Sequence, residues 1–178
     1  MRMFNGPLAL CASLLIATAP ALAQDEPQVF NAFAIAVANG AIVRSAEKQA
    51  TIAGTVAGPM FVETDEGPIE AGRVTCSAMV KVDQGSRRVT GGGACSFVAD
   101  DAAAAWGEWE CTGYLLLGCR GKLTLNGGSG RFAGVSGEST MTWRPSANVL
   151  KQQIDGPTIQ NWTGVLSWRD FKLAKAKP

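Results

Sequence analysis

Histidine is absent from all 178 residues of this chain. A site built on it therefore lacks the commonest general base and the commonest metal ligand, and Ser-His-Asp and Cys-His nucleophile systems are excluded. The residues that remain for chemistry are tryptophans, carboxylates, cysteines and one tyrosine, Tyr114. We therefore expect a site that works by shape and apolar contact. We assign no catalytic residue, no metal ligand and no cofactor.

Tryptophans are the first candidates for such a site. Trp162 and Trp168 are six residues apart, so a strand through them presents both indoles on one face. If that face points inward, the rings can stack on a flat apolar ligand while their N–H groups donate hydrogen bonds. Trp109, Trp143 and Tyr114 are further candidates for the same ligand site. The alternative is that these rings only fill the core or its rim.

Two carboxylates, Glu108 and Glu110, share one face of a predicted strand. Paired carboxylates can do acid–base work when burial raises a pKa. Trp109 lies between them and points to the opposite face. If Trp109 points inward, both glutamates face solvent, so we do not expect catalysis there.

An export signal is predicted over residues 1–23. Arg2 precedes an apolar run over 8–19 that is too short to span a bilayer, and Ala21-Leu22-Ala23 has the small-x-small pattern of a cleavage site. The exported chain would begin at Gln24. The exported chain would keep four cysteines, Cys76, Cys95, Cys111 and Cys119. An even number of cysteines in an exported chain indicates disulfides, here two.

A hairpin over residues 84–87 suggests the first disulfide. Gly85 at the first central position predicts a two-residue type II′ turn, and the register centred there places Cys76 opposite Cys95. In an unbulged ladder this pair falls at a wide, hydrogen-bonded position. A bulge within Gly91-Gly92-Gly93 would re-aim the second cysteine.

The second disulfide is expected between Cys111 and Cys119, which flank a local hairpin over residues 112–118. Pairing of Cys95 with Cys111 stays open, because their strands are also expected to be neighbours. Each bridge would add about 2–4 kcal/mol to the stability.

Charge and composition exclude some classes of partner. Sixteen basic and fifteen acidic residues give a net charge of +1. Nucleic-acid binding needs a clustered basic surplus, and so does a polybasic membrane-surface module, so we expect neither. No segment after the signal peptide is apolar for long enough to form a transmembrane helix.

Short alternating apolar runs separated by Gly, Pro, Asp and Asn predict an all-β chain. A break is expected at Gly58-Pro59, and residues 41–50 and 101–105 are the only segments whose sequence is compatible with a helical turn. Short connections and the absence of a βαβ period predict antiparallel pairing, with about eight strands closed into a barrel. We expect one domain over 24–171, followed by a frayed basic tail over 172–178. The expected strands cover 33–37, 52–56, 60–62, 74–82, 89–98, 106–117, 122–125, 132–143 and 160–171.

Residues 127–137 form a glycine-rich motif, GGSGRFAGVSG. Its spacing fits a dinucleotide fingerprint, but the glycine-rich and β-prone residues that follow do not start the helix that such a site needs. We therefore expect a structural turn that uses positive φ angles and is anchored by an aromatic ring. The residues of this turn are Gly127, Gly128, Gly130, Phe132, Gly134 and Gly137.

The same motif resembles the GGTG-F-x-x-x-x-G signature of the allene oxide cyclase and dirigent-type barrels, above all that of their secreted bacterial relatives. The run GACSFVAD over 93–100, WECxG over 109–113 and CxG over 119–121 are similar to those relatives as well, so the resemblance covers about residues 72–144. Ser129 stands where the family usually has threonine. The polar cavity residues of the plant cyclases do not map onto this chain one by one, so no mechanism transfers.

The resemblance implies an eight-stranded antiparallel, calycin-like barrel with an apolar cavity, which is often trimeric in the plant members, so we expect a monomer or a homotrimer. The signal peptide predicts export, to the bacterial periplasm or beyond. We expect it to bind a small apolar or aromatic molecule in its interior. One alternative is a cofactor-free cyclase or isomerase acting on a hydrophobic substrate, which needs a buried carboxylate or tyrosine in the cavity. The other is a solid-core barrel that acts as an interaction or inhibitor protein.

Overall fold

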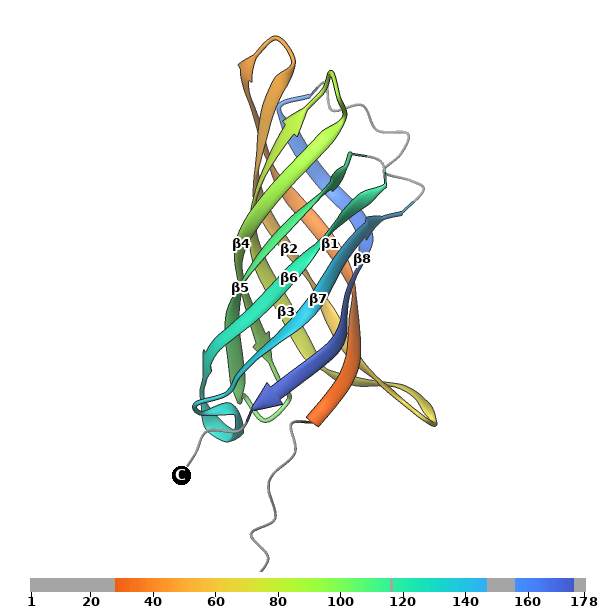
Figure 1. The fold of residues 1–178 in the computed structure, drawn as a ribbon, viewed down its shortest axis with the longest axis vertical. Coiled ribbons are helices and arrows are strands. Elements are labelled where there is room, and N and C mark those ends of the chain that lie inside the picture. The colour runs from red at the N-terminus through yellow and green to blue at the C-terminus, as the bar shows by residue number, and fades with distance from the viewer. Residues whose placement is uncertain (1–27, 116, 147–155, 175–178) are drawn as a thin grey trace, which may run out of the picture.

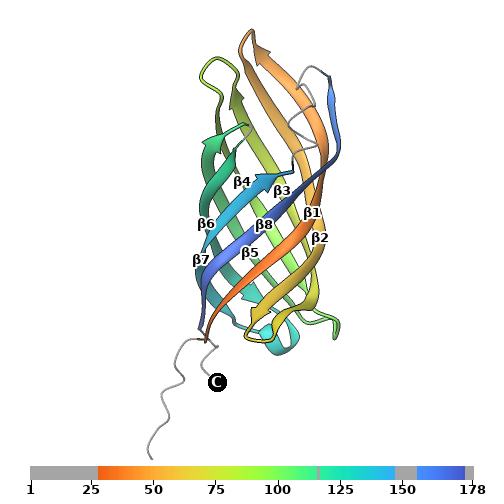
Figure 2. The same ribbon diagram turned by 90° about the vertical axis from the view of Figure 1, so that its right-hand side faces the viewer.

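The protein is all β, as predicted. The computed structural model describes residues 28–115, 117–146 and 156–174, and the predicted signal peptide lies outside them. Eight antiparallel strands pair in sequence order, and β8 also pairs with β1, so the ring is closed (Figures 1 and 2). The elements are β1 (Gln28–Ala46), β2 (Gln49–Thr64), β3 (Gly67–Asp83), β4 (Arg88–Val98), β5 (Ala104–Tyr114), β6 (Gly118–Gly128), the 3-10 helix η1 (Gly130–Phe132), β7 (Ser136–Pro145) and β8 (Thr158–Ala174).

The ring has two ends that differ in shape. The β1–β2, β3–β4 and β5–β6 connections lie at the upper end in Figure 1, and the β2–β3, β4–β5 and β6–β7 connections lie at the lower end. Strands β1, β2, β3 and β8 have 16 to 19 residues, whereas β4 to β7 have 10 or 11. The β1–β2 hairpin therefore rises above its neighbours, and the β2–β3 hairpin projects from the lower end. No helix in the described part of the chain is long and apolar enough to cross a membrane.

Alternation along the strands sorts the side chains into an apolar interior and an outer surface. On β5, Trp109 and Cys111 are buried, while the alternating residues Glu108 and Glu110 are exposed. This is the period of two that a strand with one buried face requires. The prediction that both glutamates face solvent is confirmed.

Strand β8 contains two bulges, one on each side of its tryptophans. Asn161 and Asp170 both have a φ of 54°, and the β1–β8 register shifts beside each of them. The side chain of Asn39 accepts a hydrogen bond from the Asn161 N–H at 2.9 Å, and Asn31 accepts one from the Asp170 N–H at 3.1 Å. Each bulge adds one residue to the strand, so the inward face changes there. Ile159 and Trp162 therefore both point inward at the first bulge, and Trp168 and Phe171 both point inward at the second.

The strands continue through two segments where the sequence suggested interruptions, and the predicted break at Gly58-Pro59 is wrong. Residues 41–50 hold no helical turn, because Ile42 and Ala50 are buried while Val43 is exposed, and this strand alternation outweighs the helical propensity. Gly58 and Pro59 do not end β2. Pro59 pairs with β3, and the β1–β2 ladder skips it, because proline has no N–H to donate.

Three other boundaries differ from the prediction. No helical turn forms over 101–105, because β5 already begins at Ala104. The predicted strand over 132–143 begins at Ser136, because Phe132 belongs to η1. The tail does not fray at residue 172, since β8 pairs through Leu173 with β1 and through Ala174 with β7.

The β3–β4 turn corrects the geometry of the first disulfide. The connection has four residues, 84–87, and Arg87 has a φ of 59°, so the predicted two-residue type II′ turn is wrong. Both turns share one centre, so the predicted pairing of Cys76 with Cys95 survives. The longer turn exchanges wide and narrow positions along the ladder, and the two Cα atoms are 4.0 Å apart, as at a narrow pair. The register stays constant past Gly92, so no bulge is needed.

The second disulfide joins Cys111 and Cys119, as predicted, and the Cys95–Cys111 alternative is wrong. Its Cα atoms are 5.6 Å apart, because the cysteines are diagonal neighbours: Cys111 pairs with Gly121, and Cys119 pairs with Gly113. A Cβ on either glycine would collide with the backbone of the opposite strand. The two CxG motifs are therefore one structural unit in which each cysteine faces the other motif's glycine.

The glycine motif forms the β6–β7 connection, as predicted. Gly130 and Gly134 have φ angles of +58° and +69°, which favour glycine. Phe132 packs against the core from this connection. The other predicted turn residues lie just outside it, Gly127 and Gly128 at the end of β6 and Gly137 at the start of β7.

Candidate ligand cavity

A cavity of about 120 Å³ occupies the upper half of the ring. It is smaller than the several hundred Å³, roughly 300 or more, that a site for a small-molecule ligand is expected to have. One water molecule needs roughly 10–15 Å³ of such space, so the cavity has room for about ten. Aliphatic side chains of β2 and β3, such as Val56 and Val80, form one wall. The indole rings of Trp109, Trp143 and Trp162 line the same cavity.

Small residues keep this part of the interior empty. The inward positions of β1 over residues 32–40 carry only alanine and glycine. Gly54 on β2 pairs with Ala78 on β3, and both line the cavity. A Cβ on Gly54 would collide with the Asn39 carbonyl, because β1 and β2 approach closely there. The close approach of β1 and β2 therefore requires glycine at position 54, and the missing side chain leaves space next to Ala78.

Four of the five predicted ligand residues line this one cavity, namely Trp109, Trp143, Trp162 and Tyr114. Trp143 and Trp162 are half-buried, and the ring of Trp143 lies over Gly164. Tyr114 is 47% exposed and lies at the rim, in the position where β5 ends.

Trp168 does not line this cavity and is fully buried in the middle of the barrel. Its ring meets Phe97 edge-on at 5.2 Å, and Leu123 and Met141 are buried in the same cluster. Its N–H has no hydrogen-bond partner among the described residues. Trp168 therefore fills the core, as the alternative interpretation of the tryptophans expects.

A second, smaller cavity of about 70 Å³ lies toward the lower end and has Trp168 in its wall. Phe30 and Phe171 also line it, and their rings stack at 5.1 Å. The interior is thus filled in the middle and hollow above and below.

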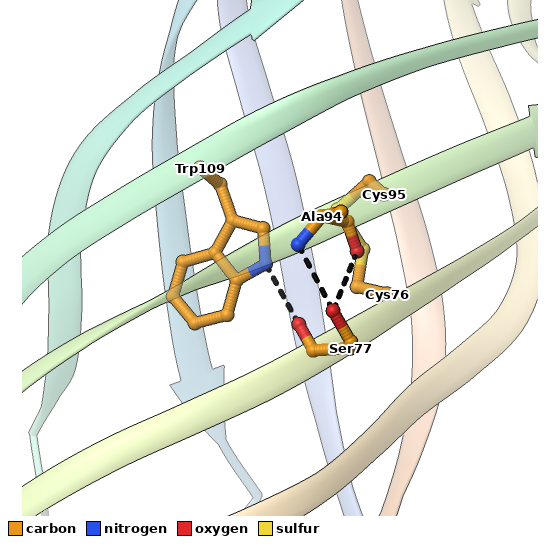
Figure 3. The surroundings of a disulfide bond; sticks show 5 residues. All are labelled: Cys76, Ser77, Ala94, Cys95 and Trp109. Atoms are coloured by element: carbon orange, nitrogen blue, oxygen red, sulfur yellow. Dashed lines mark hydrogen bonds between the residues drawn. A yellow bond between two sulfur atoms is a disulfide. The ribbon is translucent and has the colours of Figure 1, made fainter.

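Trp109 of β5 is held in the cavity wall by a hydrogen bond that reaches past β4 to β3 (Figure 3). Its indole N–H donates to the Ser77 carbonyl at 3.0 Å. The Ser77 hydroxyl accepts from the Ala94 N–H at 3.0 Å and takes the place of a ladder bond between β3 and β4, just beyond the Cys76–Cys95 disulfide. The N–H of Trp109 is therefore occupied, and only its ring is left for a ligand.

The lining offers little for acid–base chemistry. No Asp, Glu, Lys or Arg is among the described residues that line the upper cavity, and Tyr114 is its one ionisable side chain. Hydrogen bonds from Ser86 above all lower the pKa of Asp83, and a hydrogen bond to Glu138 raises the pKa of Lys122, but both groups lie on the outer surface. Within the described ranges, no His, Cys, Asp or Glu cluster could hold a metal ion.

The aliphatic wall is the part of the site that sequence reasoning missed. Its signal is the alternation Ile52-x-Gly54-x-Val56 and Ala78-x-Val80-x-Val82, which predicts an inward face but not that this face stays uncovered.

Comparison with known protein families finds no family model that matches this chain, and comparison with the curated proteins finds no match either.

Proposed function

We propose that this protein is an exported barrel that binds a small apolar or aromatic molecule in its upper cavity. The observation that carries this proposal is the apolar cavity of about 120 Å³ inside a disulfide-bonded ring, lined by indole rings and aliphatic side chains. Ligand sites have this composition, with a few polar groups among apolar walls.

Fold and cysteine pairing support the wider assignment. Eight antiparallel strands in one ring and the glycine-rich β6–β7 turn agree with the architecture of the allene oxide cyclase and dirigent-type barrels, to which we propose the chain is related. Two disulfides suit an exported protein.

The cavity favours binding over the two alternatives. A cyclase or isomerase needs a buried ionisable group beside its substrate, and the described lining offers only Tyr114 at the exposed rim. An inhibitor with a solid core needs no cavity at all. Binding of a small molecule is therefore the proposed function.

Native mass spectrometry of protein purified from the periplasm tests the proposal. We expect a bound small molecule in the wild type and its loss in Ala78→Leu, which fills the cavity. Ala53→Leu, on the exposed outer face of β2, is the matched control and should keep the ligand. A ligand-free mass, combined with no uptake of an added apolar dye, would overturn the proposal.

A further inference from the structure

The charged side chains of the barrel are sorted between its two ends, although the whole chain has a net charge of only +1. Exposed basic residues surround the upper end, where Glu47 and Asp83 are the acidic neighbours among the described residues of the β1–β2 and β3–β4 hairpins. The lower end carries an excess of carboxylates in its β2–β3 and β4–β5 connections, among them Glu66 and Asp100. The basic rim consists of Lys48, Lys81, Arg87, Arg88, Arg120 and Arg144.

The basic rim is not neutralised by ion pairs within the described residues. The ion pairs found there are Lys122–Glu138, Arg131–Asp101 and Arg169–Glu63, and none of them includes a rim residue. At the rim itself, the Asp83 carboxylate accepts hydrogen bonds from the N–H groups of Gly85 and Ser86. Its charge is therefore engaged by the β3–β4 turn.

This rim adjoins the opening of the upper cavity. Arg88 pairs with Tyr114 across β4 and β5, and the Arg87 carbonyl accepts a hydrogen bond from the Leu115 N–H at 2.9 Å. Tyr114 and Leu115 form the outer part of the cavity lining. Exposed charges act over a screening length of about 8–10 Å at moderate salt, so Arg87 and Arg88 attract an anionic group that lies at the cavity opening.

We propose that the ligand is an amphiphilic organic anion, whose apolar body enters the upper cavity while its anionic head group stays at the basic rim. This inference rests on the proposed function and adds the chemical class of the ligand. The described lining holds no charged side chain, and burying an unpaired ion there is strongly unfavourable. The head group therefore stays at the opening, where guanidinium groups suit a carboxylate, phosphate or sulfonate.

A matched pair of fluorescent probes tests the proposal. Anilinonaphthalene sulfonate and N-phenylnaphthylamine share one ring system and differ by the sulfonate, and both brighten in apolar surroundings. At low salt we expect the sulfonate to bind roughly three- to tenfold more tightly, as two exposed charge contacts allow. Salt at about 0.5 M should abolish this preference, because the charges are screened.

Charge-removing variants locate the effect. The double variant Arg87→Gln with Arg88→Gln should lose the preference for the sulfonate and keep its affinity for the neutral probe. The control, Arg73→Gln with Arg131→Gln, removes the same charge from the lower half of the barrel and should behave as the wild type. An equal loss in both variants would overturn the assignment to the rim.

Two further outcomes separate this inference from the proposed function. If the neutral probe binds the wild type as tightly as the sulfonate, and Ala78→Leu abolishes its binding, the anionic head group is refuted while the cavity remains a binding site. If neither probe binds, or Ala78→Leu leaves both affinities unchanged, the proposed function fails and the inference fails with it.

Discussion

Replacing Ala78 with leucine should stabilise the protein, because the side chain at this position faces empty space. Ala78 lines the upper cavity and pairs with Gly54, so no neighbouring Cβ on β2 occupies the volume that leucine would enter. Leucine adds three carbon atoms, worth up to about 2.4 kcal/mol at about 0.8 kcal/mol each. Ordering its side chain costs about 0.5–1 kcal/mol. The net gain of about 1.5 kcal/mol raises Tm by roughly 3–6 °C for a chain of this size.

The sign of the change decides between a hollow and a filled interior. In a filled barrel the added carbons overpack the core and cost about 1–3 kcal/mol. Thermal unfolding followed by circular dichroism measures the shift. Ala53→Leu, exposed on the outer face of β2, should change the stability by no more than about 0.5 kcal/mol. A lower Tm for Ala78→Leu, with Ala53→Leu unchanged, would refute the hollow interior.

Three other predictions concern the frame around the cavity. Gly121→Ala should destabilise by about 1–3 kcal/mol in urea unfolding, because its Cβ collides with the opposite backbone, whereas Gly156→Ala, in open space, should not; equal effects would contradict this. Asn39→Ala removes the acceptor of a bulge N–H and should cost about 1 kcal/mol in the same assay, and an unchanged stability would show that the bulge holds itself. Hydrogen bonds from Ser86 hold the pKa of Asp83 below its usual 3.8. The stability that the ionised carboxylate adds is therefore present above pH 3.8 and is lost as the pH falls through the lower pKa of the folded state. In urea unfolding at a series of pH values, the free energy of unfolding of Asp83→Asn should fall less on acidification than that of the wild type.

Alternation and glycine chemistry made much of the fold predictable from the sequence. The even spacing of Trp162 and Trp168 places both indoles on one inward face, as the structure has them. The turn centre between Gly85 and Ser86 pairs the first two cysteines correctly even though the turn type is wrong, because pairing depends on the centre and not on the length of the turn. Local patterns of this kind need no knowledge of the rest of the chain.

Features that depend on contacts between distant strands were not predictable. The bulge at Asn161 depends on Asn39, which lies more than a hundred residues earlier in the chain. Pro59 looks like a strand break, but one of its neighbouring ladders simply omits a hydrogen bond. The cavity itself arises because Gly54 and Ala78 meet at the same level, which only the register of β2 and β3 determines.

Charge counting missed the basic rim for the same reason. A near-neutral total excludes a chain that is basic throughout, but the ring gathers residues from separate strands and connections at one end. Lys48 and Arg88 are forty residues apart in the sequence, yet Lys48 lies in the β1–β2 connection and Arg88 begins β4, both at the upper end of the barrel. Net charge describes the chain, whereas recognition depends on where the fold places each charge.

The most direct test of the central claim, that the open interior of the barrel binds the ligand, is the indole N–H spectrum of isotope-labelled protein titrated with N-phenylnaphthylamine. Trp143 and Trp162 line the upper cavity, whereas Trp106 is 43% exposed on the outer wall and lies over Gly127. We predict that the signals of Trp143 and Trp162 shift with saturation while the signal of Trp106 stays in place. Shifts confined to Trp106, or no shift at any indole at probe saturation, would contradict the claim.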